Sequence, residues 1–429
     1  MRRRELAQRP RMKPNNSPPD MPNLDFLRAC AVCLVVGHHL FIFFPTIKVG
    51  LLNFSGIGYW GVLIFFVHTS FVLTLSLHRQ AQQRPGRRLL WPFLIRRTFR
   101  IFPLSILIVL LVYGLNLPVG HVRPGSFVPV HVSLWGFLSN LFLVQNLTHT
   151  ESVMSPLWSL PYEMQMYLVL PALFVLARSA RTAWPLFGVW AIGFIAAVRP
   201  WYFERHGVPD LIEYVPYFLA GIIGYRCMAT PTRQVPSILW PVFLAAVSAL
   251  YLRDTSAADG RGPICCLLIG LAIPRFAQLQ QPSVVAISNR VARYSYGIYL
   301  THFICIWFAF QALGNLQTGA RWLVFIASMS LIPIALHHTL EAPMIRLGQR
   351  VASCLRDRSR EAGHRADTQA GTVFLQREDR VRSREAAPLG QESRPPVTLF
   401  RGSEADSDAV ENDGEDRGRR PSGDGRARP

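Results

Sequence analysis

Long apolar segments separated by short polar loops run through the first 350 residues of this 429-residue chain. A helix that crosses a bilayer needs about 20 mostly apolar residues. Ten segments approach or reach that length, near residues 24–45, 57–78, 99–117, 161–177, 184–198, 211–227, 236–252, 262–276, 294–313 and 321–341. A shorter segment, 133–147, contains Ser133, Asn140 and Gln145, and we expect it to be re-entrant or interfacial. The pattern predicts an all-α, polytopic membrane helical bundle of about ten transmembrane helices.

The location of the charge along the chain, rather than its total, adds to this picture. Half of the residues (50%) are hydrophobic, yet the net charge is +19. Residues 351–429 hold fifteen Arg and fifteen Asp or Glu, so the whole excess belongs to residues 1–350. A nucleic-acid-binding protein would not combine its basic residues with long apolar segments. We therefore expect no nucleic acid partner, and we expect the basic residues to mark topology and to attract membrane lipid.

Basic residues gather in alternate loops, which indicates the cytoplasmic face of the membrane. The stretch that links the second and third segments has no acid and seven arginines: Arg79, Arg84, Arg87, Arg88, Arg96, Arg97 and Arg100. Placing this stretch inside puts both termini in the cytoplasm. Counting 133–147 as a full span would invert every later loop and weaken the bias. The Arg-rich, Lys-poor composition suggests a bacterial source, so we expect a multi-pass inner-membrane protein.

Three parts follow from composition. Residues 1–21 form a basic cytoplasmic N-terminal segment, and residues 22–350 form the transmembrane domain. Residues 351–429 are rich in Arg, Glu, Asp, Gly and Pro, which predicts a disordered cytoplasmic tail. The seven cysteines include one CxxC spacing, Cys30 and Cys33 inside the first apolar segment, but no second pair of the kind that a zinc site needs, and we interpret the cysteines as small buried apolar residues.

Ionisable side chains inside membrane spans are costly, so each is a candidate for function. The first span contains Arg28, His38 and His39. Arg28 and His39 are eleven residues apart, which places them on one face of a helix, about 16 Å from each other. A lone intramembrane histidine is more often a structural group than a catalyst. Spacing alone therefore leaves the two interpretations of this pair balanced.

Six short blocks occur in the order found in a known family of membrane proteins. They are residues 24–29 (LDFLRA) followed by the two histidines, 61–67 (GVLIFFV), 96–103 (RRTFRIFP), 157–163 (LWSLPYE), 294–302 (YSYGIYLTH) and 341–343 (EAP). Together they resemble acyltransferase family 3 over roughly residues 22–350. The family pattern of an Arg, ten residues and a His falls on Arg28 and His39. One departure is His68-Thr69-Ser70, where the family usually has Leu-Ser-Gly, and this change is expected to reshape the acceptor pocket.

The resemblance implies transfer of an acyl group, acetyl or another short one, from cytoplasmic acyl-CoA to a hydroxyl group. The acceptor would be a glycan, a lipid-linked sugar or a small molecule. Acyl-CoA would be a substrate, and no bound cofactor is expected. The alternative is a transporter or flippase of a lipid or glycan without acyl transfer, but such proteins typically show repeated, broken spans that are not evident here.

The chemistry of the reaction suggests a role for each residue. His39 would act on the acceptor hydroxyl, either as a base or by carrying the acyl group. Arg97 and Arg100 would bind the phosphates of the donor, and Arg28 would bind phosphate or hold the geometry of the site. Glu163 would orient His39 or bind acceptor hydroxyls. The weaker substrate-binding candidates are His38, Tyr167 and His302.

Plainer interpretations stand beside these roles. The arginines of residues 96–100 are also typical of topology anchors, and Glu163 is also placed to cap a helix after Pro161. His337 and His338 beside Glu341 suggest a metal cluster, but only paired histidines occur, so we expect no metal site.

Overall fold

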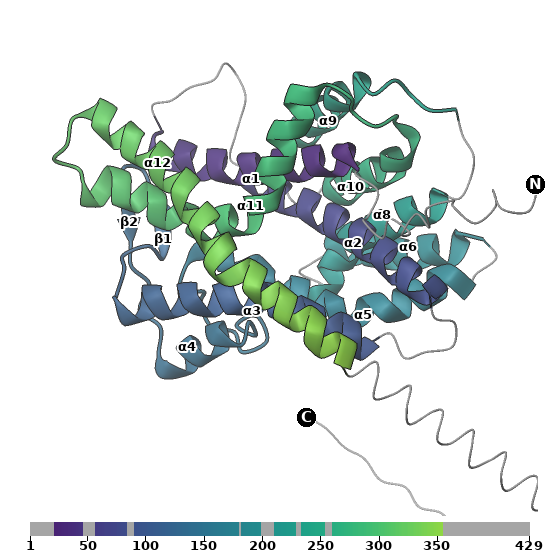
Figure 1. The fold of residues 1–429 in the computed structure, drawn as a ribbon, viewed down its shortest axis with the longest axis horizontal. Helices are drawn as coiled ribbons and strands as arrows, with labels where there is room; N and C mark the ends of the chain where they lie inside the picture. Colours follow the sequence, from purple (N-terminus) through teal and green to yellow (C-terminus); the bar gives the residue numbers. More distant parts are fainter. Residues whose placement is uncertain are drawn as a thin grey trace, which may run out of the picture. The chain divides into compact units, whose positions relative to one another are not determined.

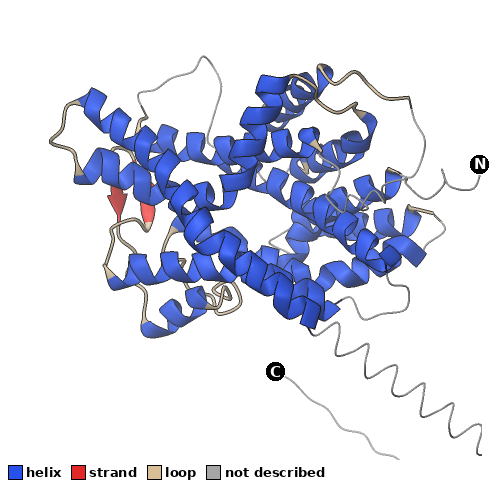
Figure 2. Cartoon of the chain, viewed as in Figure 1, coloured by secondary structure: helices blue, strands red, loops and turns tan. Residues whose placement is uncertain are grey.

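The computed structural model describes residues 21–45, 56–83, 90–179, 182–198, 210–228, 233–253 and 260–354. Helices account for most of these residues, and a two-stranded hairpin is the regular β structure found among them (Figures 1 and 2). Residues 1–20 of the predicted basic segment and residues 355–429 of the predicted tail lie outside the described residues, whereas residues 351–354, predicted to belong to the disordered tail, are helical.

Every predicted apolar segment coincides with a helix. The ten helices are α1 (Pro22–Phe43), α2 (Ile57–Gln83), α3 (Leu90–Gly114), α5 (Ser159–Ser179), α6 (Trp184–Val198), α8 (Leu211–Cys227), α9 (Leu239–Leu252), α10 (Arg261–Ala272), α11 (Pro282–Trp307) and α12 (Thr318–Leu336). Helix α12 continues through a π-helical turn, His337–Glu341, and on to Cys354. The all-α class predicted from the apolar pattern is confirmed for the described residues.

Four helical stretches among the described residues are long and apolar enough to cross a membrane: Pro22–Phe43, Ile57–Gln82, Ser155–Ser179 and Thr318–Cys354. Helices α3 and α11 are also long, with 25 and 26 residues, but they carry several arginines. The other helices are shorter. The chain therefore has helices long and apolar enough to span a membrane, and other long helices in which several arginines lower the hydropathy.

The segment 133–147 folds differently from the ten others. It contains α4 (Leu134–Leu141), whose eight residues extend about 12 Å, well short of a bilayer. Ser133 caps its start by accepting a hydrogen bond from Gly136 N at 3.1 Å. The buried Asn140 amide donates to the carbonyls of Gly136 and Glu151, both at 2.8 Å, and so ties the helix to the loop that follows. The strands β1 (His121–Arg123) and β2 (Ser126–Val128) precede it as an antiparallel hairpin.

Helices α1 and α11 pack along each other and run in the same direction. Asp25 Oδ2 accepts from Asn289 Nδ2 at 3.2 Å near the start of both helices. Further along both helices, Arg28 meets Ser295, and then His39 meets His302. Because the residue numbers of the contacts increase along both helices, the two helices are parallel. This packing places two candidate residues of α1, Arg28 and His39, against α11.

Close packing between α2 and α8 explains one departure from the family pattern. A Cβ atom at Gly221 would lie 2.1 Å from Ser70 Oγ and 2.3 Å from the Val67 carbonyl oxygen, so only glycine fits there. Ser70 Oγ itself donates to Val67 O at 3.0 Å. The bulkier Ser70 is therefore accommodated by a glycine on the neighbouring helix, and Ser70 lines neither of the cavities described below.

Candidate functional site

A cavity of about 650 Å³ opens among α1, α2, α3, α11 and the π-helical turn of α12. Its lining carries five arginines and one carboxylate: Arg28, Arg79, Arg97, Arg100, Arg293 and Asp25. His68 and His337 also line it. A concave surface with this excess of positive charge fits a polyanion, and guanidinium groups bind phosphate through paired hydrogen bonds.

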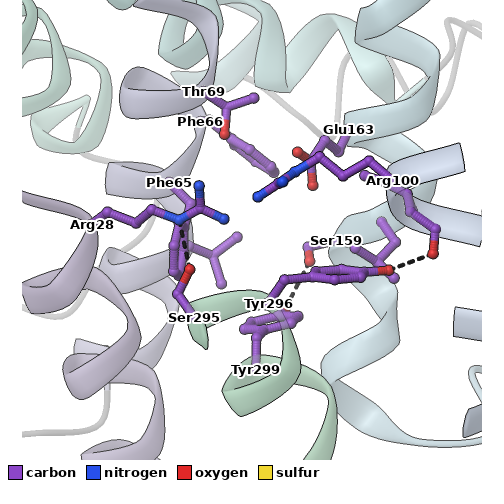
Figure 3. Close-up of a pocket in the computed structure, with 13 residues that line it drawn as sticks. Arg28, Phe65, Phe66, Thr69, Arg100, Ser159, Glu163, Ser295, Tyr296 and Tyr299 are labelled. Carbon is purple, nitrogen blue, oxygen red and sulfur yellow. Dashed lines mark hydrogen bonds between the residues drawn. The ribbon is translucent and has the colours of Figure 1, made fainter. Parts of the chain in front are cut away.

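A second, smaller cavity of about 50 Å³ shares Arg28 and Arg100 with the first. Arg28 and Arg100 point toward each other across it, and Glu163 lies beside Arg100 (Figure 3). Its remaining lining is largely apolar and aromatic: Val62, Phe65, Phe66, Ile101, Leu160, Tyr296 and Tyr299, with Thr69, Ser159 and Ser295. Two arginines therefore mark the boundary between a large basic cavity and a small, mostly apolar one.

Arg28 is held in place by α11. Its Nε donates to Ser295 Oγ at 2.6 Å, and Ser295 Oγ donates in turn to Ala292 O at 2.8 Å. These two hydrogen bonds orient the guanidinium so that its two terminal nitrogens face the small cavity (Figure 3). Arg28 thus faces the small cavity with its orientation fixed by α11.

Two tyrosines of α11 form one wall of the small cavity. Tyr296 OH donates to Ile101 O at 2.7 Å, which joins α11 to α3. Tyr299 OH donates to Pro156 O at 2.7 Å and accepts from Ser159 Oγ at 2.7 Å, which joins α11 to the start of α5. The cavity wall is consequently rigid, because each phenol is fixed by a neighbouring helix (Figure 3).

Glu163 lines the small cavity from α5, and Tyr167 OH donates to its Oε1 atom. The helix begins at Ser159 and has no acidic residue in its first turn, so Glu163 is not its cap. No hydrogen bond among the described residues joins Glu163 to His39. The structure thus places Glu163 at the small cavity and Tyr167 behind it, where Tyr167 lines neither cavity.

The three arginines of α3 separate into two kinds. Arg96 donates to Gln80 Oε1 at the end of α2 and so links two helices. Arg97 and Arg100, three residues apart and on one helix face, both line the large cavity. Arg97 Nε is buried without a hydrogen-bond partner among the described residues, and its guanidinium lies 5.9 Å from the Phe93 ring centroid. The predicted pair therefore faces a cavity, whereas Arg96 serves as an anchor.

His39 and His302 meet at the other end of α1, where His302 Nε2 lies 3.1 Å from His39 Nδ1. The edge of Phe303 packs against the His39 ring at a centroid distance of 4.6 Å. His38 turns toward α2, where a Cβ atom at Gly58 would lie 2.4 Å from its ring. None of these three histidines lines either cavity. The structure thus forms two groups from the predicted residues, an arginine–glutamate group and a histidine pair.

The residues that depart from the family pattern on α2 face different places. Thr69 lines the small cavity, and His68 lines the large one. His68 is only 5% exposed, and its Nδ1 has no hydrogen-bond partner among the described residues. The changes were expected to reshape one pocket, but the two residues line different cavities, so any effect on shape falls on both.

The two histidines of the π-helical turn have different partners, a carboxylate for His337 and the Tyr294 hydroxyl for His338, whose Nε2 lies 3.3 Å from it. His337 Nδ1 lies 3.3 Å from Glu341 Oε2, and the Glu341 side chain is buried. Within the described part of the chain, no group of three or more His, Cys, Asp or Glu side chains is placed to hold a metal ion. His337 instead contributes to the lining of the large cavity.

Comparison with known proteins agrees with this geometry. The Acyl_transf_3 family, described as an acyltransferase domain, matches residues 21–338. The chain belongs to acyltransferase family 3. It is an acyltransferase that transfers groups other than aminoacyl groups, and no solved structure matches it.

Three relatives illustrate the range of this acyltransferase family. Acyltransferase MdmB of Streptomyces mycarofaciens is 26% identical over 376 residues, covering 76% of this chain and 92% of the relative. Nodulation protein 10 of Rhizobium leguminosarum bv. viciae is 24% identical, covering 73% of this chain and 89% of the relative. Peptidoglycan O-acetyltransferase OatA of Listeria monocytogenes is 30% identical over 160 residues, covering 35% of this chain and 24% of the relative.

Sequence reasoning missed three polar residues of the site: Ser295, Tyr299 and Ser159. All three lie inside motif blocks that carry the family resemblance. Their membership in a block was the available signal. Polar hydroxyls inside apolar spans are common, however, and their partners on distant helices are not visible in sequence.

Proposed function

We propose that the protein is a membrane O-acyltransferase that moves a short acyl group, such as acetyl, from acyl-CoA to a hydroxyl of a glycan, lipid-linked or small-molecule acceptor. The observation that carries this proposal is the 650 Å³ cavity with its five arginines. Coenzyme A carries its phosphate groups at the nucleotide end and its thioester at the far end of a long flexible arm. The large cavity would take the phosphates, and the arm would extend past Arg28 and Arg100.

The size of the small cavity favours the proposal that the transferred acyl group is short. Its volume of about 50 Å³ leaves little space beyond a few atoms, and its walls are fixed by hydrogen bonds between helices. The name of the relative peptidoglycan O-acetyltransferase OatA also favours acetyl transfer to a glycan hydroxyl. Glu163, which faces this cavity, would accept hydrogen bonds from acceptor hydroxyls.

In the proposed mechanism, His39 acts as the general base. The thioester carbonyl would lie at the end of the small cavity formed by Tyr299, whose ring centroid is 6.0 Å from that of His302, the partner of His39. His39 takes the proton of the acceptor hydroxyl while the hydroxyl oxygen bonds to the thioester carbonyl carbon. The carbon–sulfur bond then breaks, and the CoA sulfur receives the proton from His39. Arg28 and Arg100 hold the donor, and a positioned base of this kind typically contributes about 100- to 10,000-fold to a rate.

The proposed topology has ten spans with both termini in the cytoplasm of an inner membrane. The parallel pairing of α1 and α11 supports it, because the first and ninth of ten spans run in the same direction. A full span at α4 would make α11 the tenth span and antiparallel to α1. Reporter fusions at both ends test this topology, and extracellular reporters would contradict the assignment of Arg97 and Arg100 to cytoplasmic CoA.

The central test of the proposed function is catalytic. Purified protein is mixed with labelled acetyl-CoA and candidate acceptors, and free CoA is measured. We expect acceptor-dependent CoA release that falls at least about 100-fold in His39→Ala, with unchanged membrane insertion. CoA release absent with every acceptor, together with an unchanged cellular acylation product in His39→Ala, would refute the enzyme. If the protein were instead a transporter without acyl transfer, His39→Ala would keep its full transport activity.

A further inference from the structure

The histidine pair joins residues 263 positions apart in the chain and belongs to neither cavity. His302 is fully buried, at 0% exposure, on α11. Three contacts define the pair. His302 Nδ1 lies 2.7 Å from Tyr299 O, His302 Nε2 lies 3.1 Å from His39 Nδ1, and His39 Nδ1 lies 2.9 Å from Val35 O.

The donors and acceptors assign the protons of both neutral rings. A carbonyl oxygen only accepts, so His302 carries its proton on Nδ1 and presents the lone pair of Nε2. His39 Nδ1 faces two acceptors, the Val35 carbonyl and His302 Nε2, so it carries the His39 proton. The remaining nitrogen, His39 Nε2, is then the basic one. All three contacts are satisfied when the His39 Nδ1 proton is shared between Val35 O and His302 Nε2.

We propose that His302 is a positioning residue, which fixes the tautomer and ring orientation of His39 and stabilises the charge that His39 gains during the reaction. This inference rests on the proposed function, in which His39 Nε2 takes the acceptor proton. The cation formed on His39 then shares its Nδ1 proton with His302 Nε2. Histidine bases depend in general on a partner at the second ring nitrogen.

The neighbourhood of His39 supports this role for His302. The His38 ring lies 4.9 Å from the His39 ring, edge-on, and Phe303 packs against His39 at 4.6 Å. Among the described residues, the hydrogen-bond contacts of His39 Nδ1 are with Val35 O and His302 Nε2, and Val35 O is a backbone group that no substitution removes. His302 is therefore the side chain through which the tautomer of His39 can be changed.

The first test compares two substitutions of similar size. His302→Phe keeps the ring volume but removes the acceptor, whereas His302→Gln keeps an amide oxygen that accepts a hydrogen bond. We expect kcat to fall roughly 10- to 100-fold in His302→Phe and to recover by at least about fivefold in His302→Gln. The KM values for donor and acceptor should stay within about twofold. His131→Phe, an exposed histidine away from both cavities, is the control.

Non-additivity distinguishes a positioning role from a structural one. If His302 acts through His39, adding His302→Phe to His39→Ala lowers the residual rate no further. An unchanged kcat in His302→Phe would overturn the inference, as would equal losses in His302→Phe and His302→Gln or additive losses in the double variant. Wild-type turnover, measured in the same assay, tests the proposed function separately.

A second measurement does not depend on activity. Nitrogen NMR of the ¹⁵N-histidine-labelled full chain reports which ring nitrogen carries the proton, and the His39→Ala and His302→Phe spectra assign the two signals. We expect both rings protonated on Nδ1 in the wild type, and a mixture of His39 tautomers in His302→Phe. A His39 ring protonated on Nε2 in the wild type would overturn the inference.

Discussion

Two groups of ionisable side chains meet at the pair of helices α1 and α11, and they differ in charge and in whether they line a cavity. The first group is Arg28, Arg97, Arg100 and Glu163, in which Arg28 of α1 contacts Ser295 of α11. The second is the pair His39 and His302, whose contact lies eleven residues, or about 16 Å, further along α1. The first group lines both cavities and carries permanent positive charge. The second lines neither cavity and consists of imidazoles, which gain and lose protons readily.

The difference indicates a division of labour. Permanent charges inside a membrane are costly and need a counter-charge, which a phosphorylated donor would supply. A base must instead be free to take a proton, and neutral imidazoles whose Nδ1 protons are held by backbone carbonyls meet that need. We expect substitutions in the first group to change donor binding and substitutions in the second to change the chemical step.

The largest expected effect on donor binding comes from Arg97. Hydrogen bonds to charged groups are worth about 1.5–3 kcal/mol, so Arg97→Gln should raise the KM for acyl-CoA about 10- to 100-fold. Steady-state kinetics with varied donor measure this change. Arg346→Gln, at an exposed arginine that lines neither cavity, is the matched control. A lower kcat with an unchanged KM would remove Arg97 from the donor site.

A smaller effect is expected from Ser295→Ala, which removes the acceptor for Arg28 Nε. The guanidinium would lose its fixed orientation but keep its charge, so kcat/KM should fall about tenfold. Ser330→Ala is the control, because Ser330 Oγ bonds only to Ile326 O of its own helix in the described structure. Equal activity of the two variants would show that Arg28 needs no support from α11.

The sequence predicted the positions of the helices well, because long apolar segments leave few other structures in a membrane. Boundaries were less accurate where charge enters a helix. Helix α3 was expected from residue 99 but begins at Leu90, since Arg96 and Arg97 lower the local hydropathy without ending the helix. Its arginines face a cavity or bond to Gln80, so the helix tolerates them.

The roles of the candidate residues stay predictions, and the structure shows only where these residues lie. Arg28, Arg97, Arg100 and Glu163 line cavities, whereas His38, His39, Tyr167 and His302 line neither. The contact between His39 and His302 could not be derived, because it depends on the parallel packing of two helices 263 residues apart. The fit of Ser70 against Gly221 was equally hidden, since it involves a space that only the folded chain defines.

The smallest expected effect comes from His68→Leu, which restores the apolar residue usual in the family. His68 Nδ1 has no partner among the described residues, so the substitution removes no described hydrogen bond to that atom and should not lower the melting temperature. Only a bound donor would lose a contact, and we expect the KM for acyl-CoA to rise about threefold. Unchanged kinetics would mean that the donor does not reach His68.

The affinity of the protein for CoA tests the division of labour most directly. Isothermal titration of CoA into purified wild type, His39→Ala and Arg97→Gln gives three Kd values under one condition. The account predicts that His39→Ala binds CoA as the wild type does, although it has lost turnover, and that Arg97→Gln binds about 10- to 100-fold more weakly. Weakened binding in His39→Ala, or wild-type affinity in Arg97→Gln, would contradict the separation of donor binding from proton transfer.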